Sequence, residues 1–168
     1  QPAIEPLIKT HWDQVAPYNL KCPKVDNYNC LTGCVATALA QMMYYYRCPE
    51  TSTAIPYYTT KKNGIYMKAL PATTFKWDLM KSKYSSNETG DAVDAVAELM
   101  LYVGQSCEMD YDAGSSGAVA SIEAMVNYFG YSKNMQSISR ASYPVSQWES
   151  VTSRLEERRV GKECRSRW

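Results

Sequence analysis

Apolar residues recur at helical spacing directly after Gly33. Within residues 34–46, the apolar positions on one helical face are Val35, Leu39, Met42, Met43 and Tyr46. This i, i+4, i+7, i+8, i+11 spacing is typical of an amphipathic helix. Thr32 and Gly33 are suitable start residues, so the pattern predicts a helix that has Cys34 in its first turn.

A second helix is predicted over residues 91–102. Its apolar stripe consists of Val93, Val96, Ala97 and Met100. Gly104 follows shortly after, and glycine is favoured just past a helix end. We therefore expect the helix to end before Gly104.

A third helix is predicted over residues 118–129. The residues expected to face inward are Val119, Ile122, Val126 and Phe129. Ser115 or Ser116 supplies a start signal, and Gly130 closes the helix.

The remaining stretches give weaker patterns. Residues 48–83 are rich in Pro, Thr and Tyr and predict loops with short strands. Ser146 and Glu149 form a capping-box pattern, so a further helix is expected to begin near residue 146. Residues 154–168 then have almost no apolar face. This tail is either foreign sequence, which we favour, or a native basic tail.

Length and composition indicate one soluble globular domain. The chain has 168 residues, of which 45% are apolar and 21% charged, values outside the disordered and fibrous ranges. No apolar run approaches the roughly 18 residues of a membrane span, and residues 1–13 lack the apolar stretch of a signal peptide. A start at Gln1 fits a processed chain, although an artificial start would look the same.

The charge distribution argues against nucleic-acid binding. The formal net charge is +1, but residues 1–153 carry twelve basic and fourteen acidic side chains. A nucleic-acid binder would carry a clustered basic face, and none is visible there. The fourteen tyrosines either fill the core or provide a surface of flat, amphipathic rings.

The spacing of the cysteines argues against a structural zinc site but not against disulfides or a reactive thiol. The six cysteines are Cys22, Cys30, Cys34, Cys48, Cys107 and Cys164. They contain no Cys-x-x-Cys pair, so we expect no structural zinc site. The cysteines can therefore form disulfides, be buried as free thiols, or include a reactive thiol. Cys34 is the candidate for reactivity, because free N–H groups and the macrodipole at a helix start favour a thiolate.

The segment Thr32-Gly33-Cys34-Val35-Ala36-Thr37-Ala38, continued by Ala40-Gln41-Met42-Met43-Tyr44-Tyr45, resembles the nucleophile helix of streptopain-family peptidases. These are secreted bacterial papain-like cysteine endopeptidases, made as zymogens. The similarity runs from residue 1 to about residue 153. Its other segments, in order, are Gln1-Pro2, Trp12-Asp13-Gln14, Glu98-Leu99-Met100, Met109-Asp110-Tyr111, Gly114-Ser115-Ser116-Gly117, Asn127-Tyr128-Phe129-Gly130-Tyr131 and Trp148-Glu149.

The resemblance implies roles for specific residues. Cys34 is the expected nucleophile, and Gln14 the side-chain amide that stabilises the oxyanion together with the Cys34 backbone N–H. Without the resemblance, Gln14 reads equally well as an exposed loop residue. Ser115, Ser116 and Gly117 are expected to form part of the substrate-binding wall, and a plain helix-start turn is the alternative.

The resemblance also implies a fold and a context. The expected fold is α+β and papain-like, here mainly the helical half with the C-terminal sheet half truncated, so that residues 1–153 form a partial catalytic domain. Protein or peptide substrates and an inhibitory propeptide are the implied partners, and no cofactor or metal is implied. Export would favour disulfides among Cys22, Cys30, Cys48 and Cys107, while Cys34 stays free.

The sequence departs from the family at the catalytic base. A papain-type cysteine needs a histidine some 130–150 residues downstream, and no histidine follows His11. His11 is a weak candidate for a replacement base. We therefore expect a cysteine endopeptidase whose histidine segment is missing from this chain. The alternatives are an inactive papain-like module that binds peptides or surfaces, and a papain-fold amidase or acyltransferase.

Overall fold

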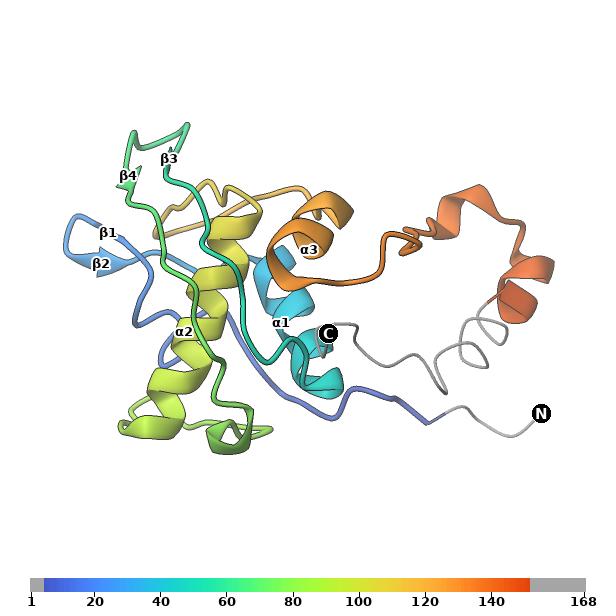
Figure 1. The fold of residues 1–168 in the computed structure, drawn as a ribbon, viewed down its shortest axis with the longest axis horizontal. Coiled ribbons are helices and arrows are strands. Elements are labelled where there is room, and N and C mark those ends of the chain that lie inside the picture. The colour runs from blue at the N-terminus through green and yellow to red at the C-terminus, as the bar shows by residue number, and fades with distance from the viewer. Residues whose placement is uncertain (1–4, 152–168) are drawn as a thin grey trace.

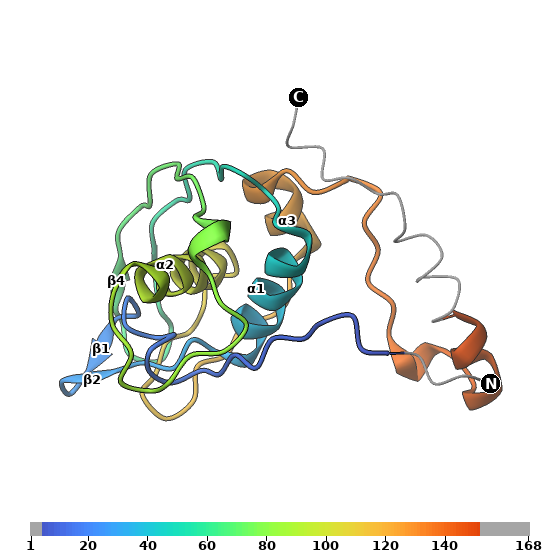
Figure 2. The ribbon, with the colours of Figure 1, turned by 90° about the horizontal axis from the view of Figure 1, so that it is seen from below.

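The computed structural model describes residues 5–151 and places two helices at its centre (Figure 1). The elements follow in the order β1 (Lys24–Val25), β2 (Tyr28–Asn29), α1 (Cys34–Tyr46), β3 (Tyr58–Thr59), β4 (Tyr66–Met67), the 3₁₀ turn η1 (Trp77–Leu79), α2 (Asp91–Ser106), α3 (Ile122–Phe129) and the 3₁₀ turn η2 (Arg140–Ser142). Figures 1 and 2 both show α2 between the two hairpins on one side and α1 with α3 on the other.

Helix α1 begins and ends where the pattern predicts, but most of its fully buried residues lie outside the predicted stripe. Its buried residues are Ala36, Thr37, Ala40 and Met43. Of the predicted face, Val35, Leu39 and Met42 are only half-buried and Tyr46 is exposed. Leu39 and Met42 nevertheless pack against the core, so the predicted face is confirmed in part. Helix α1 packs against α2, and Ala36 and Ala40 are fully buried, which the apolar spacing did not predict.

Helix α2 is the central element and is buried on most sides. The predicted stripe of Val93, Val96, Ala97 and Met100 is confirmed as buried. The helix continues to Ser106, however, so the expected end before Gly104 is wrong. Gly104 serves close packing instead, because a Cβ there would collide with the hydroxyl of Tyr111.

Helix α3 is shorter than predicted and starts later. Its N-cap is Ser121, whose side chain accepts a hydrogen bond from the Ala124 N–H, so Ser115 and Ser116 are not its start signal. Val119 lies before the helix and is 85% exposed, which contradicts its expected inward position. Gly130 closes the helix in the left-handed conformation, as predicted.

The loop-and-strand prediction for residues 48–83 is confirmed. Strands β3 and β4 pair antiparallel, with Tyr58 opposite Met67, and an isolated bridge between Ile55 and Leu70 extends the pairing. The shorter β1–β2 hairpin precedes α1. Residues 145–151 are helical, so the helix expected near residue 146 is also present.

Aromatic rings fill two parts of the core. One group consists of Trp12, Tyr18, Tyr44 and Tyr84, and the other of Phe75, Trp77, Tyr102 and Phe129. Both interpretations of the tyrosine content therefore hold in part, because Tyr28, Tyr57 and Tyr66 remain exposed. Over the described residues, none of the helices combines the length and apolar character needed to cross a bilayer.

Candidate active site

Cys34 is the first residue of α1, and it is an exposed free thiol. The preceding Gly33 provides no side-chain cap for the helix. The N–H groups of the first turn are thus available to other acceptors, and the positive end of the macrodipole lies at the same place. This end of α1 is suited to stabilising negative charge that develops on a bound group.

The backbone before Cys34 is held rigidly. Gly33 has φ +85°, and a Cβ there would lie 2.5 Å from Sδ of Met109 and 3.3 Å from the carbonyl oxygen of Ser116. The Thr37 hydroxyl donates to the Gly33 carbonyl at 3.0 Å, and its oxygen lies 2.8 Å from that of the Thr32 hydroxyl. Residue 33 must therefore be glycine, and the position of Cys34 is fixed from both sides.

The segment that carries Gln14 lies against this backbone. The N–H of Thr32, two residues before Cys34, donates to the Gln14 carbonyl at 3.1 Å. The segment is anchored by Trp12, which is buried and donates from its indole nitrogen to the Lys81 carbonyl at 2.8 Å. The structure thus brings the half-buried Gln14 to the backbone that leads into Cys34.

The loop formed by residues 112–117 approaches from another side. Leu31 donates its N–H to the Asp112 carbonyl at 3.1 Å, and the Ser116 carbonyl lies close to Gly33. The Ser116 side chain is buried and bonds the Asp112 backbone twice, at 3.0 Å each. The N–H and carbonyl of Gly117 are both paired with Asp110, while Ser115 is exposed. Ser116 and Gly117 therefore shape the loop.

Asp112 holds this loop in place, and its role was missed at the sequence level. Its carboxylate accepts hydrogen bonds from Lys62 Nζ at 2.8 Å and Asn63 Nδ2 at 3.0 Å. It also accepts two from the backbone N–H groups of Gly114 and Ser115 at 3.3 Å. These bonds, that with Lys62 foremost, hold the pKa of the Asp112 carboxyl well below its usual range. The Asp-x-Gly-Ser turn pattern was the available signal.

Asp112 also connects the candidate site to the β3–β4 hairpin. Lys62 and Asn63 lie in the turn of that hairpin, and Asp110 Oδ1 accepts the N–H groups of Lys61 and Lys62 at 2.9 Å each. Asn63 additionally donates to the Tyr111 carbonyl. The turn of the hairpin is therefore fastened to the loop beside Cys34.

His11, the weak candidate for a replacement base, is not hydrogen-bonded to Cys34 in the described residues. It is exposed, and its backbone N–H donates to the Ser82 carbonyl at 2.8 Å. Across residues 5–151, no hydrogen bond joins its imidazole to Cys34. The structure thus brings Cys34, the Gln14 segment and the 112–117 loop together without an imidazole.

The other free thiols lie in a different environment. Cys22 and Cys30 are buried, and burial raises the pKa of the Cys22 thiol to about 12 and raises that of Cys30 as well. Cys107 is partly exposed. Cys22, Cys30 and Cys107 are all free, so the expected pairing is wrong for these three, whereas Cys48 is disulfide-bonded. Cys34 is free, as expected.

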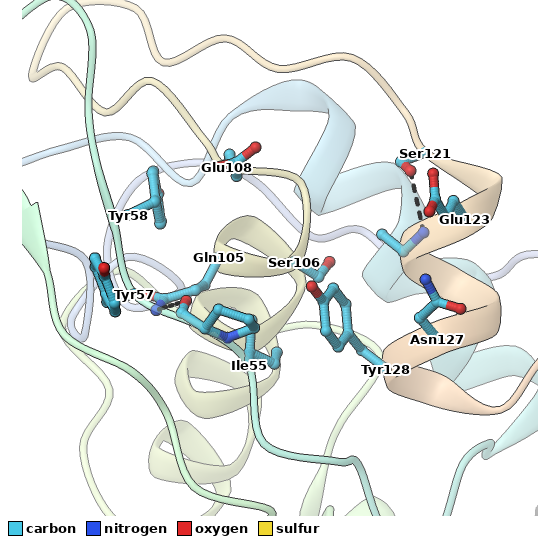
Figure 3. Close-up of a pocket in the computed structure, with 12 residues that line it drawn as sticks. Ile55, Tyr57, Tyr58, Gln105, Ser106, Glu108, Ser121, Glu123, Asn127 and Tyr128 are labelled. Carbon is cyan, nitrogen blue, oxygen red and sulfur yellow. Dashed lines mark hydrogen bonds between the residues drawn. The ribbon is translucent and has the colours of Figure 1, made fainter.

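A separate pocket of about 210 Å³ lies between residues 55–58, the end of α2 and the start of α3 (Figure 3). None of Gln14, Cys34 or Ser115 lines it. Within the described part of the chain, no group of three or more His, Cys, Asp or Glu side chains could hold a metal ion.

Sequence comparison gives a family and curated relatives. A family model described as the Peptidase C10 family matches residues 12–160. The chain is 31% identical over 172 aligned residues to streptopain of Streptococcus pyogenes serotype M28 (strain MGAS6180), covering 89% of this chain and 43% of that protein. It is 29% identical to the thiol protease/hemagglutinin PrtT of Porphyromonas gingivalis, covering 89% of this chain and 17% of that protein. The chain spans less than half the length of these relatives.

Solved structures of cysteine proteases are also similar to this chain. The active wild-type cysteine protease interpain A of Prevotella intermedia superposes with a TM-score of 0.76 at 33% identity, covering 87% of this chain and 62% of that one. A mutant prointerpain A fragment from the same organism gives a TM-score of 0.78 at 33% identity, covering 90% and 51%. The predicted α+β, papain-like fold is confirmed by these similarities.

Proposed function

Because the chain belongs to the Peptidase C10 family, we propose that it is the nucleophile-bearing part of a cysteine endopeptidase that cleaves protein substrates. The observation that carries the proposal is the exposed thiol of Cys34 at the first residue of α1. A thiol at a helix N-terminus combines access with a local positive field, which nucleophilic catalysis by cysteine requires.

Cys34 acts first. Its thiolate attacks the scissile carbonyl carbon, so an Sγ–C bond forms and the carbonyl π electrons move to oxygen. When the tetrahedral intermediate collapses, the C–N bond breaks and the amine leaves with a proton from the general acid. Water then hydrolyses the thioester and returns the free thiol.

The oxyanion is stabilised by two donors in this proposal. One is the backbone N–H of Cys34, and the other is the side-chain amide of Gln14. The hydrogen bond from Thr32 to the Gln14 carbonyl supports this pairing, because it fixes the Gln14 backbone beside the nucleophile's backbone. Donors held in advance at the oxyanion position stabilise the transition state without reorganisation.

The substrate lies along the 112–117 loop. Ser115 offers an exposed hydroxyl there, while Ser116 and Gly117 keep the loop's shape through their bonds to Asp112 and Asp110. We add Asp112 to the three proposed binding residues, because its hydrogen bonds hold their loop in place. Any backbone pairing with an extended substrate would have to use groups other than the Gly117 N–H and carbonyl.

The general base comes from outside these 168 residues. The chain has one histidine, His11, and covers 43% of the matched streptopain. We therefore assign the imidazole, and the group that orients it, to a segment that the chain does not contain. In papain-type enzymes this imidazole accepts the thiol proton and later protonates the leaving amine.

An inactive peptide- or surface-binding module is the second candidate. It is favoured by one observation: among the described residues, no hydrogen bond joins His11, whose backbone N–H is bonded to Ser82, to Cys34. Such a module would use the same 112–117 wall but would not turn over substrate.

Secretion and zymogen control complete the proposal. Synthesis with an inhibitory propeptide is supported by the similarity to a prointerpain fragment. The streptopain resemblance in the sequence supports secretion. Neither step involves a cofactor or metal.

The test compares the complete reading frame with this chain. The complete protein is expected to contain a downstream histidine and to hydrolyse casein in a manner that E-64 inhibits, whereas the 168-residue chain hydrolyses little or none. A complete protein that binds peptides but never cleaves them would favour the inactive module. Robust E-64-sensitive cleavage by the 168-residue chain would identify a base within it, with His11 the first to test.

A further inference from the structure

The pocket between α2 and α3 has the size of a single side chain. Its walls come from residues 55–58, the C-terminal end of α2 and the first turns of α3. Its volume of about 210 Å³ is below the roughly 300 Å³ at the lower end for small-molecule sites. It shares no lining residue with the proposed peptidase site, so any ligand here would not be the peptide held at Cys34.

The charge at this pocket is entirely negative. Glu108 and Glu123 stand on opposite sides of it (Figure 3), and no Lys, Arg or His lines it. Within residues 5–151, neither carboxylate forms an ion pair; the pairs there join Arg47 to Asp78, Lys62 to Asp112 and Lys81 to Glu88. Both glutamates are exposed, and two unpaired carboxylates at the rim of one cavity favour a cation between them.

Gln105 provides a second, independent observation. It lines the pocket and is only 2% exposed. Its Nε2 donates to the Pro56 carbonyl at 3.1 Å and to the Lys68 carbonyl at 2.8 Å, which fixes the orientation of the amide. Its Oε1 is buried and accepts no hydrogen bond from the described residues. A buried acceptor without a donor is costly, and a donor-rich ligand would satisfy it.

The hydroxyl groups of the pocket reinforce this preference for a donor. Ser106 uses its proton to donate to the Val103 carbonyl at 2.6 Å, which leaves its oxygen as an acceptor. Tyr58 likewise donates its proton to the Met109 carbonyl at 2.8 Å. Both groups therefore present oxygens without an available proton.

The walls suit the alkyl part of such a ligand. Tyr57, Tyr58 and Tyr128 line the pocket together with Ile55 and Ala124. Aromatic faces attract cations, and apolar walls accommodate the methylene stem of a long basic side chain.

We propose that this pocket binds an alkyl chain that ends in a guanidinium or ammonium group, as an arginine or lysine side chain does. The cation lies between Glu108 and Glu123, its N–H groups satisfy the acceptors at the base of the pocket, and its methylenes contact the tyrosine rings. Arginine fits best, because its five donors can reach several acceptors at once. The ligand is either a polypeptide that presents such a side chain or a free cationic metabolite of the same chemistry.

The experiment titrates the 168-residue chain with N-acetyl-L-arginine methylamide, followed by ¹H–¹⁵N NMR. N-acetyl-L-citrulline methylamide is the matched neutral probe. We expect the arginine probe to shift the side-chain amide signal of Gln105 and to bind at least about tenfold more tightly than the citrulline probe. Added salt should weaken the arginine probe selectively.

Three variants locate the site. The double variant Glu108→Gln/Glu123→Gln should weaken arginine binding at least about tenfold, while Glu50→Gln, an exposed carboxylate outside the pocket, should leave it unchanged. Asn127→Arg places a built-in guanidinium at the exposed rim and should block the probe while both glutamates remain. A thermal unfolding transition like that of the unmodified chain would show that each variant is folded.

The outcomes are decisive in either direction. Equal binding of the arginine and citrulline probes, binding that survives the double variant, or no shift at Gln105 would each overturn the proposal. Tighter binding of acetyl-Gly-Gly-Arg-Gly-Gly amide than of the single-residue probe would identify a polypeptide as the ligand, and equal binding a free cation. Because the readout does not depend on Cys34, failure of the proposed peptidase activity leaves this test unaffected.

Discussion

Cys30 and Cys34 stand at the two ends of the short segment that joins β2 to α1, yet their surroundings are opposite. Cys30 is fully buried, its N–H donates to the Pro23 carbonyl at 2.8 Å and its carbonyl accepts from Asn19 Nδ2 at 3.1 Å. Cys34 is exposed at the first residue of a helix. Only three residues thus separate a thiol enclosed by packing from one that is exposed at a helix start.

Backbone geometry, and not residue type, sets the different exposure of these two thiols. Burial raises the pKa of Cys30, so its thiol stays protonated. The turn at Gly33, which only glycine can adopt against Met109 and Ser116, is what brings the chain from the enclosed position to the open one.

The largest effect is expected from the nucleophile itself. In the complete protein, Cys34→Ala should lower kcat by on the order of 10⁶, because the covalent step is lost. Cys30→Ser is the matched control. It removes a thiol that does not reach the substrate, so any loss should come from weakened packing. Casein hydrolysis by both variants measures the difference. If activity survives Cys34→Ala but is lost in Cys30→Ser, then Cys30 and not Cys34 is the nucleophile.

Gln14→Ala should have the next largest effect. Loss of one oxyanion donor costs about 10²–10³ in kcat, while the Gln14 carbonyl still accepts from Thr32 because that bond is made by the backbone. Steady-state kinetics, with thermal unfolding as the folding control, test this. An unchanged kcat would show that Gln14 does not stabilise the oxyanion and is only a residue of the loop.

Gly33→Ala tests the turn between the two cysteines. A Cβ in the left-handed conformation costs about 1–2 kcal/mol, and the contact with Met109 adds about 1–3 kcal/mol of overpacking. Urea unfolding of the 168-residue chain should show the loss. Gly64→Ala is the matched control, since Gly64 also has positive φ, at +59°, but has no atom within 4 Å of its Cβ position. Equal losses in both variants would mean that the close packing at Gly33 is unimportant.

Asp112→Asn should produce a smaller, selective change. The substitution weakens the charge-assisted bond from Lys62 and frees the loop beside Cys34. We expect KM to rise about tenfold with kcat nearly unchanged, because the loop positions substrate and does not touch the reacting atoms. Asp78→Asn, which removes the exposed Arg47 ion pair, is the control. A fall in kcat alone would show that Asp112 acts on the nucleophile instead.

The sequence predicted the helices better than their contacts. The limits of α1 followed from Gly33 and the apolar spacing, but its most deeply buried residues did not, because Ala36 and Ala40 are small and give a weak apolar signal although both are fully buried in a helix that packs against α2. Gly104 likewise has the sequence appearance of a helix end, and only the position of Tyr111 shows that it is a packing residue.

The candidate site was predictable where it depends on local sequence. Cys34 stands in a specific motif at a helix start, so it could be found. Asp112 could not be ranked above other acidic residues, since its partners Lys62 and Asn63 lie about fifty residues away and meet it only through the β3–β4 hairpin. The tail at residues 154–168 lies outside the described residues, and its foreign origin remains a prediction.

The most direct measurement is the relative rate at which iodoacetamide alkylates the cysteines of the folded 168-residue chain, read by peptide mass spectrometry at pH 8. Cys34 should be alkylated at least about 10²-fold faster than Cys30, because one thiol is open at a helix start and the other is enclosed and protonated. Cys22, whose pKa burial raises to about 12, should be as slow as Cys30. Equal rates for Cys34 and Cys30, or faster reaction of Cys30, would contradict the assignment of Cys34 as the nucleophile.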